Sequence, residues 1–208
     1  KDKLILFDTT LRDGQQTQGV DFSVQDKINI AQALDDIGVD YIEGGWPGAN
    51  PTDTKFFEKN NHFQNAKFTA FGMTKRAGRS ADNDPQLRAL IDSNSDSVCL
   101  VAKTWDFHVD LALGISLDEN IDAIKDSITS VMSGGKEAMI DCEHFFDGFK
   151  SNPSFSYQCI QTSIDAGAEW VILCDTNGGT LPNEIYKIVS EVTKRFPGNK
   201  IGIHCHND

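Results

Sequence analysis

The sequence predicts an α/β protein, a TIM (β/α)8 barrel, and three observations support this fold class. Short apolar runs alternate strictly with segments of helical periodicity, which is the pattern of a parallel sheet whose strands are joined by helices. Polar and charged residues gather at the carboxyl end of nearly every predicted strand, where barrels of this kind keep their reactive groups. No GxGxxG segment follows the first predicted strand, which counts against an open dinucleotide-binding sheet.

The predicted strands are the apolar runs. The first one, LILFDTT, is a short apolar run, as expected of a strand that is buried on both faces. We predict strands over residues 4–10, 41–46, 67–73, 97–103, 137–146, 170–176 and 200–206.

The predicted helices fill the segments between these strands. In the first, Ser23 is a favourable N-cap, Ile28 and Leu34 fall on one face, and Gly38 is a natural end. A closed barrel needs eight strands, and about 250 residues are typical. We therefore expect residues 1–208 to form one catalytic barrel domain, truncated after strand seven. The helices are expected at 23–38, 52–60, 84–94, 117–132, from after 146 to about 166, and at 182–196.

Composition narrows the possible partners. The net charge of −12 repels nucleic acid and anionic membrane surfaces, so neither is expected as a partner. An anionic substrate would need a local positive centre, such as an arginine, a helix N-terminus or a metal ion. No apolar run approaches the roughly 20 residues of a membrane span, and no secretory signal is recognisable. The five cysteines are dispersed without CxxC spacing, which indicates reduced thiols and a cytoplasmic protein.

Two segments at opposite ends of the chain predict a metal site. DTTLRDG, which begins at Asp8, follows the first predicted strand, and HCHND lies on the seventh. Because residues two apart in a strand point the same way, His204 and His206 share one face. Two imidazoles and one carboxylate, with open positions for water or substrate, suit a divalent metal ion. Spacing alone leaves Asp8, Asp13 and Asp208 open as the carboxylate.

These segments also resemble a known signature. DTTLRDGQQ together with HCHND is similar to the paired motifs of the DRE-TIM metallolyases, or HMGL-like family, which includes isopropylmalate, homocitrate and citramalate synthases and hydroxymethylglutaryl-CoA lyase. The resemblance covers the whole chain in order. Three further segments resemble the citramalate-synthase branch, and GGWPG in the first of them favours that branch over isopropylmalate synthases. They are YIEGGWPGANP (41–51), CEHFFDGFKSNP (142–153) and VILCDTNGGTLP (171–182).

The resemblance implies a metal-ligand set and a substrate site. Asp13, His204 and His206 would bind the metal, and Zn, Mn, Mg and Co all suit such ligands. Arg12 would lie beside the keto oxygen of the substrate and stabilise the charge that develops there. Thr176 would donate a hydrogen bond to the carboxylate of a 2-keto acid.

Two glutamates complete the implied site. Glu143, at the end of the fifth predicted strand, matches a family residue near the acyl-CoA thioester. Glu43, at the end of the second, would line the same mouth and contact the substrate. The alternatives are a salt bridge at the barrel rim for each glutamate and a helix cap for Thr176. Asp8 would position Arg12 rather than bind the metal.

The implied activity is that of an acyltransferase. Acetyl-CoA would lose a methyl proton and attack the ketone of a 2-keto acid, with pyruvate favoured and citramalate as the product, a step toward isoleucine. Isopropylmalate and homocitrate synthases stay open, because one methylene changes discrimination by only about 1–3 kcal/mol. Two further classes of protein also stay open, a hydroxymethylglutaryl-CoA-type lyase and a non-catalytic metal-binding barrel. We expect a homodimer at full length and little or no activity from the 208-residue chain by itself.

Overall fold

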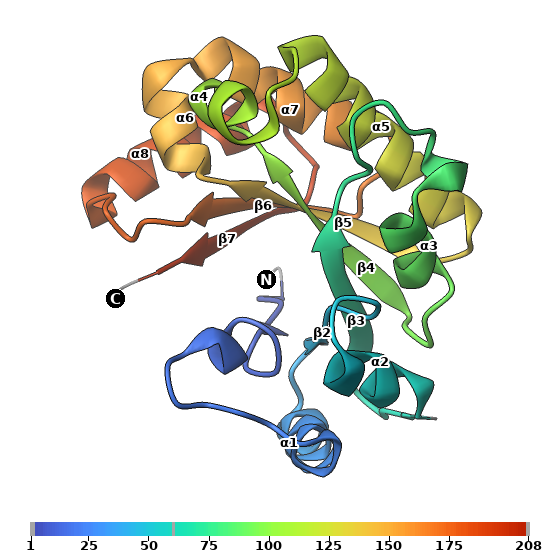
Figure 1. The fold of residues 1–208 in the computed structure, drawn as a ribbon. Helices are drawn as coiled ribbons and strands as arrows, with labels where there is room; N and C mark the ends of the chain where they lie inside the picture. The colour runs from blue at the N-terminus through green and yellow to red at the C-terminus, as the bar shows by residue number, and fades with distance from the viewer. Residues whose placement is uncertain (1–2, 60, 207–208) are drawn as a thin grey trace.

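A computed structural model describes residues 3–59 and 61–206, in which seven parallel strands form one sheet. Each strand is hydrogen-bonded to the next in chain order, and the sheet curves into an arc (Figure 1). This is the arrangement of a (β/α)8 barrel with seven of its eight strands, so the predicted fold class is confirmed. The strands are β1 (Phe7–Asp8), β2 (Tyr41–Gly45), β3 (Lys67–Met73), β4 (Ser97–Lys103), β5 (Glu137–Glu143), β6 (Trp170–Asp175) and β7 (Ile201–Cys205).

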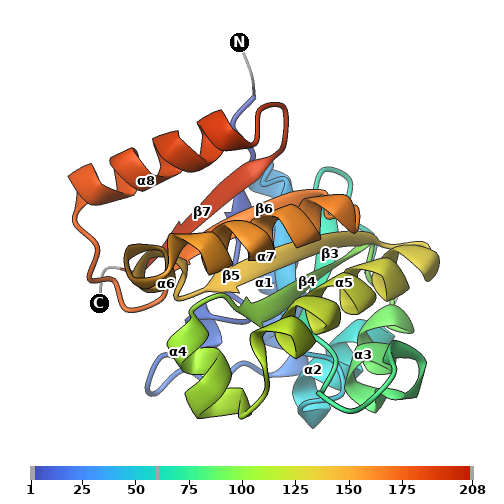
Figure 2. The same cartoon turned by 90° about the horizontal axis from the view of Figure 1, so that it is seen from above.

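Helices cover the convex face of the sheet (Figures 1 and 2). At the carboxyl end of β4, the short α4 (Asp106–His108) continues into a π-helical turn, Val109–Leu113. Within the part of the chain that the structure describes, no helix is both long and apolar enough to cross a membrane. The other helices are α1 (Val24–Ile37), α2 (Pro51–Glu58), α3 (Pro85–Ile91), α5 (Leu117–Ser133), α6 (Phe145–Ser151), α7 (Pro153–Asp165) and α8 (Pro182–Arg195), with 3-10 turns at Gly14–Gln16 and Ala81–Asn83.

The inner face of the sheet changes from apolar to charged along the strands. Near the amino ends, Tyr41, Cys99 and Met139 form a buried cluster of their own. Two residues further along β2 and β5, and therefore on the same face, lie the buried carboxyl groups of Glu43 and Asp141. The main apolar core packs between the sheet and the helices. The outer layer therefore supplies most of the hydrophobic stabilisation, and the carboxyl end of the inner face is left to polar groups.

The predicted boundaries are correct where one periodicity continues and wrong at turns. β3 and β4 have the predicted bounds. The predicted strand 4–10 pairs only over Phe7–Asp8, because a tight turn follows it and the backbone N–H of Leu6 donates to the Asp40 side chain before it. The fifth predicted helix is two helices, since Asn152 ends α6 and its side chain accepts the backbone N–H of Phe155 to begin α7. The helical segment 106–113 has no counterpart in the prediction.

Candidate active site and metal centre

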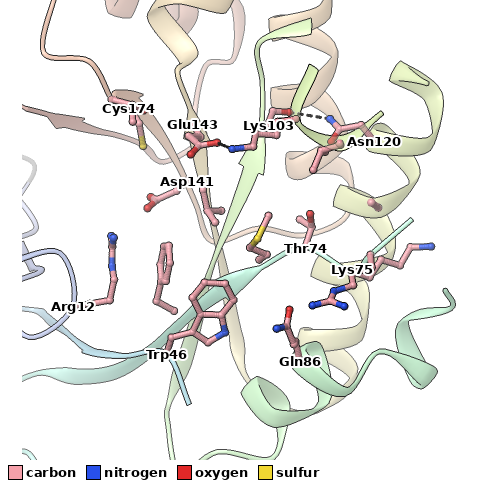
Figure 3. A pocket seen from close by; sticks show the side chains of 18 of the residues that line it. Arg12, Trp46, Thr74, Lys75, Gln86, Lys103, Asn120, Asp141, Glu143 and Cys174 are labelled. Atoms are coloured by element: carbon pink, nitrogen blue, oxygen red, sulfur yellow. Dashed lines mark hydrogen bonds and ion pairs between the residues drawn. The ribbon is translucent and has the colours of Figure 1, made fainter. Parts of the chain in front are cut away.

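An open cavity of about 680 Å³ lies at the carboxyl ends of the strands (Figure 3). This is where (β/α)8 barrels hold their reactive groups, as the polar strand ends in the sequence predict. Every strand, or the loop after it, contributes to the cavity wall. In strand order, the contributions include Arg12, Trp46, Lys75, Lys103, Glu143, Thr176 and His204.

Asp13, His204 and His206 come together at one edge of this cavity. The carboxylate oxygen Oδ2 of Asp13 lies 3.2 Å from Nε2 of His204 and 3.5 Å from Nε2 of His206. The two imidazoles stack with their ring centroids 4.9 Å apart, as expected of side chains two apart in a strand. One donor atom from each residue falls within 4.8 Å of the others, a spacing that fits one divalent ion. Asp208, another candidate carboxylate, lies outside the described residues.

A tight turn after β1 presents Arg12 and Asp13 to the cavity. The carbonyl oxygen of Thr9 accepts hydrogen bonds from the backbone N–H groups of Arg12 at 3.1 Å and Asp13 at 2.9 Å. The carboxyl group of Asp8 accepts from the backbone N–H of Thr10 at 2.9 Å and from its hydroxyl at 3.2 Å. Asp8 therefore braces the turn and positions Arg12 through the backbone, and its carboxylate does not join the group around Asp13.

The guanidinium of Arg12 is fixed beside the metal-ligand group. Its Nε donates to Oε2 of Glu43 at 2.7 Å, and its Nη1 lies 3.5 Å from the Asp13 carboxylate. The guanidinium carbon also lies 3.8 Å from the centroid of the Phe71 ring, which is a cation–π contact. Burial by itself lowers the pKa of Arg12, but the charges of Glu43, Asp13 and Asp141 outweigh it and raise the pKa. The cation is thus held in one orientation at the cavity wall.

Glu43 lies beneath Arg12 rather than on the cavity wall. Its side chain is fully buried, and its Oε1 has no hydrogen-bond partner among the described residues. Burial raises the pKa of Glu43, and the opposing charge of Arg12 lowers it. The rim salt bridge considered from the sequence is therefore an interior ion pair. The predicted contact of Glu43 with the substrate would act through Arg12, and this role stays a prediction.

Two glycines of the GGWPG segment allow close packing under this ion pair. A Cβ on Gly44 would stand 2.4 Å from the ring of Phe68. Gly45 has a φ of +137°, which favours glycine, and a Cβ there would stand 2.5 Å from the carboxyl group of Asp53. Asp53 in turn pairs with the fully buried ammonium group of Lys27. The glycines are thus required by the contacts that support the end of β2.

Thr176 stands at the end of β6 with its hydroxyl at the cavity. Its Oγ1 accepts the backbone N–H of His144 at 2.8 Å, which leaves the hydroxyl hydrogen available to donate. The helix-cap alternative for Thr176 is wrong, because the next helix begins at Pro182 with Leu181 as its N-cap. Among the described non-glycine residues, His144 alone has a positive φ, +50°, so the backbone at this end of β5 is strained next to the cavity.

Glu143 faces the cavity from the end of β5 and forms an ion pair with Lys103 (Figure 3). The side chain of Asn120 donates to the carbonyl oxygen of Lys103 at 2.9 Å, which anchors the end of β4 to α5. The rim salt bridge considered as an alternative for Glu143 is therefore present. It does not remove the carboxylate from the cavity, since both partners line the wall.

Asp141 and Cys174 also line the cavity, and neither is among the predicted site residues. Burial raises the pKa of Asp141, while the charges of Arg12 and His204 lower it. Donor atoms of Asp141, Cys174 and His204 lie within 4.8 Å of one another, so they form a second set of possible metal ligands. The sequence holds the signal for Asp141, because it stands two residues before Glu143 on one strand and so shares its face.

Comparison with known proteins places this site in context. The HMGL-like family model matches residues 3–208. An (R)-citramalate synthase of Aquifex aeolicus is 49% identical over 100% of this chain and 40% of its own length. A 2-isopropylmalate synthase of Sulfolobus acidocaldarius is 29% identical over 99% of this chain and 51% of its own. The structure of the HMG-CoA lyase of Bacillus subtilis superposes with a TM-score of 0.82 at 17% identity, covering 100% of this chain and 70% of that one.

The fold and the site define a (β/α)8 barrel that carries a candidate divalent-metal centre at its strand ends. The chain belongs to the HMGL-like family. It spans about 40% of the length of the (R)-citramalate synthase it matches. At 17% identity, the likeness to the lyase shows the fold alone.

Proposed function

We propose that the protein condenses acetyl-CoA with pyruvate and hydrolyses the thioester to give citramalate and CoA. The methyl carbon of the acetyl group would lose a proton and form a bond to the keto carbon, and water would then release CoA. The observation that supports this most is the convergence of Asp13, His204 and His206 beside Arg12 in a chain that is 49% identical to an (R)-citramalate synthase. The 2-isopropylmalate synthase is less similar, at 29% identity.

The metal ligands of this proposal are Asp13, His204 and His206. Their oxygen and nitrogen donors suit Zn, Mn, Mg or Co, and all three side chains line the cavity, where water or substrate would complete the coordination of a bound ion. A bound divalent ion would supply Lewis-acid polarisation of the ketone.

Arg12 would stabilise the negative charge that develops on the keto oxygen. Its guanidinium lies 3.5 Å from Asp13, so a keto oxygen near the metal ligands would also lie near this cation. The hydrogen bond to Glu43 and the contact with Phe71 hold the guanidinium before the substrate arrives. The guanidinium would therefore be in position to stabilise negative charge on the keto oxygen before that charge develops.

Thr176 and Glu143 would hold the two substrates. The hydroxyl of Thr176 has a free hydrogen and would donate it to the carboxylate of pyruvate. Glu143 would lie against the thioester of acetyl-CoA, with its charge balanced by Lys103.

The test is CoA release from acetyl-CoA by the protein at its natural length. Pyruvate, 2-ketoisovalerate and 2-ketoglutarate would be compared with and without a chelator. Release with pyruvate alone, lost on chelation, is the expected result. A preference for 2-ketoisovalerate would assign an isopropylmalate synthase, and no release with any keto acid would overturn the proposal. The homodimer and the cytoplasmic location stay predictions, tested by light scattering and by fractionation of cells.

A further inference from the structure

The loop after β3 carries a concentration of positive charge in an otherwise acidic chain. Residues 74–79 read TKRAGR, with three cations in six positions, whereas the net charge of the chain is −12. Lys75 and Arg76 both line the cavity, and Arg79 does not. An acidic protein that binds an anion needs a local positive centre of this kind.

The two cavity-lining cations differ in what they already bind. The ammonium of Lys75 pairs with Asp126 at 2.9 Å and donates to the carbonyl oxygen of Arg79 at 3.1 Å. Arg76 is anchored by its backbone N–H, which donates to Asp84 at 2.8 Å. Within residues 3–59 and 61–206, the structure records no hydrogen bond or ion pair of the Arg76 guanidinium. The backbone of the loop is thus anchored. The side chain of Arg76 is exposed at the edge of the cavity.

The cationic loop lies away from the candidate metal ligands, across the same cavity. The metal ligands come from the loop after β1 and from β7, whereas Arg76 follows β3. Figure 3 shows Arg12 on one side of the cavity and Lys75 on the other. Met73 and Val101, from β3 and β4, and Ala112 and Leu113 of the π-helical turn add apolar side chains to the cavity lining. The cavity therefore has the candidate metal ligands at one side, a cationic loop at the other, and apolar side chains in its lining.

We propose that Arg76 binds a phosphate group of the CoA moiety of the acyl donor. This inference rests on the proposed function, which places the thioester near Glu143. From there the pantetheine arm would run along the apolar side chains of the cavity lining, and the nucleotide phosphates would reach the cationic loop. A guanidinium donates two parallel hydrogen bonds to phosphate oxygens, and among the described cations that line the cavity, that of Arg76 is the one without another partner.

The kinetic test compares two acyl donors in two variants of the natural-length protein. Arg76→Gln should raise KM for acetyl-CoA about tenfold, the effect of losing one charge-assisted contact, and leave KM for pyruvate unchanged. The same variant should have the same KM as the unaltered protein for S-acetyl-pantetheine, which lacks the nucleotide phosphates. Arg79→Gln removes an equal charge from the same loop, outside the cavity. It should change the KM for neither acyl donor. Equal effects of the two variants, or an equal loss of activity with both donors, would overturn the inference.

A binding measurement keeps this inference separate from the proposed function. Calorimetric titration with CoA and with pantetheine needs no turnover. Tighter binding of CoA than of pantetheine, with the difference abolished by Arg76→Gln and retained by Arg79→Gln, supports the phosphate site even if no keto acid releases CoA. Equal affinity for the two ligands in the unaltered protein would overturn the phosphate site, even if citramalate is formed.

Discussion

Arg12 and Asp13 are adjacent on one turn and bring opposite charges into the same cavity. The turn makes this possible, because the carbonyl of Thr9 binds both of their backbone N–H groups and directs the two side chains to one place. The carboxylate of Asp13 is the part of that turn that pairs with the two histidines. We therefore expect binding of a metal ion to depend on Asp13 more than on any other residue of the first motif.

Asp13→Asn should weaken binding of a divalent ion at least about 100-fold. An amide oxygen carries no charge, and the site would lose one of its three protein ligands. Isothermal titration with Mn or Zn measures the change. Asp8→Asn is the matched control on the same segment, since its amide oxygen can still accept the N–H of Thr10, and it should bind the ion normally. An equal loss in both variants would show that the turn, and not the Asp13 carboxylate, accounts for the effect.

Thr176→Val should raise KM for pyruvate about ten- to a hundredfold and leave KM for acetyl-CoA nearly unchanged. The substitution keeps the shape of the side chain but removes the hydroxyl hydrogen that would meet the carboxylate. Steady-state kinetics with each substrate varied in turn gives the two values. Thr176→Ser keeps the hydroxyl and should restore binding of pyruvate. If Ser and Val behave alike, Thr176 does not bind the keto acid.

At the scale of elements, sequence patterns predict the strands and helices that have a regular periodicity. They miss boundaries that are set by the contacts of a single side chain. β3 and β4 were predictable because a short apolar run fills most of each strand. The break between α6 and α7 depends on one side chain, that of Asn152, which caps α7 and also donates to Asp106 at 2.8 Å. That second contact joins segments 46 residues apart, and periodicity holds no information about it.

The candidate site shows the same division. The convergence of Asp13, His204 and His206 was predictable, because the resemblance to a family signature indicates Asp13 and a period of two brings the two histidines to one face. Two other contacts depend on the register between neighbouring strands, which cannot be read from the sequence. They are the ion pair of Glu143 with Lys103 and the hydrogen bond of Arg12 to Glu43 beneath it. Asp141 was predictable in principle from its strand face, but a single buried carboxyl group resembles no motif.

The buried ammonium of Lys27 joins three elements under the site. It donates to the carbonyl oxygens of Leu11 at 2.8 Å and Gly44 at 2.9 Å, and it pairs with Asp53 of α2. Burial lowers the pKa of Lys27, and the Asp53 charge opposes that shift. Lys27, from α1, thus fixes the residue that precedes Arg12 and the residue that follows Glu43.

Lys27→Met should lower the free energy of unfolding by about 3–5 kcal/mol, because it leaves the buried carboxylate of Asp53 without its counter-charge. Lys67→Met is the matched control: its ion pair with Glu137 is half-exposed and should contribute at most about 1 kcal/mol. Urea unfolding of both variants gives the two values. If Lys27→Met lowers the free energy of unfolding no more than Lys67→Met does, the buried ion pair does not stabilise the site as argued.

On the scale of the whole molecule, the candidate metal centre joins strands that the sheet does not. β1 and β7 are the two edges of the seven-stranded sheet. Asp13 follows the first edge strand, and His204 lies on the other. An ion bound between them would therefore link the turn after β1 to β7, so binding should stabilise the fold as well as the site.

A divalent ion at 100 times its Kd should raise the free energy of unfolding by about 2.7 kcal/mol, with increased hydrogen-exchange protection concentrated in β7 and in the turn after β1. Thermal unfolding and hydrogen exchange, each with and without a chelator, measure the two effects. His206→Ala should abolish both, whereas Cys174→Ser should leave them unchanged, because Cys174 belongs only to the second ligand set. The reverse pattern, with loss in Cys174→Ser and retention in His206→Ala, would place the ion among Asp141, Cys174 and His204. It would then leave the turn that carries Arg12 and Asp13 without a metal link to β7.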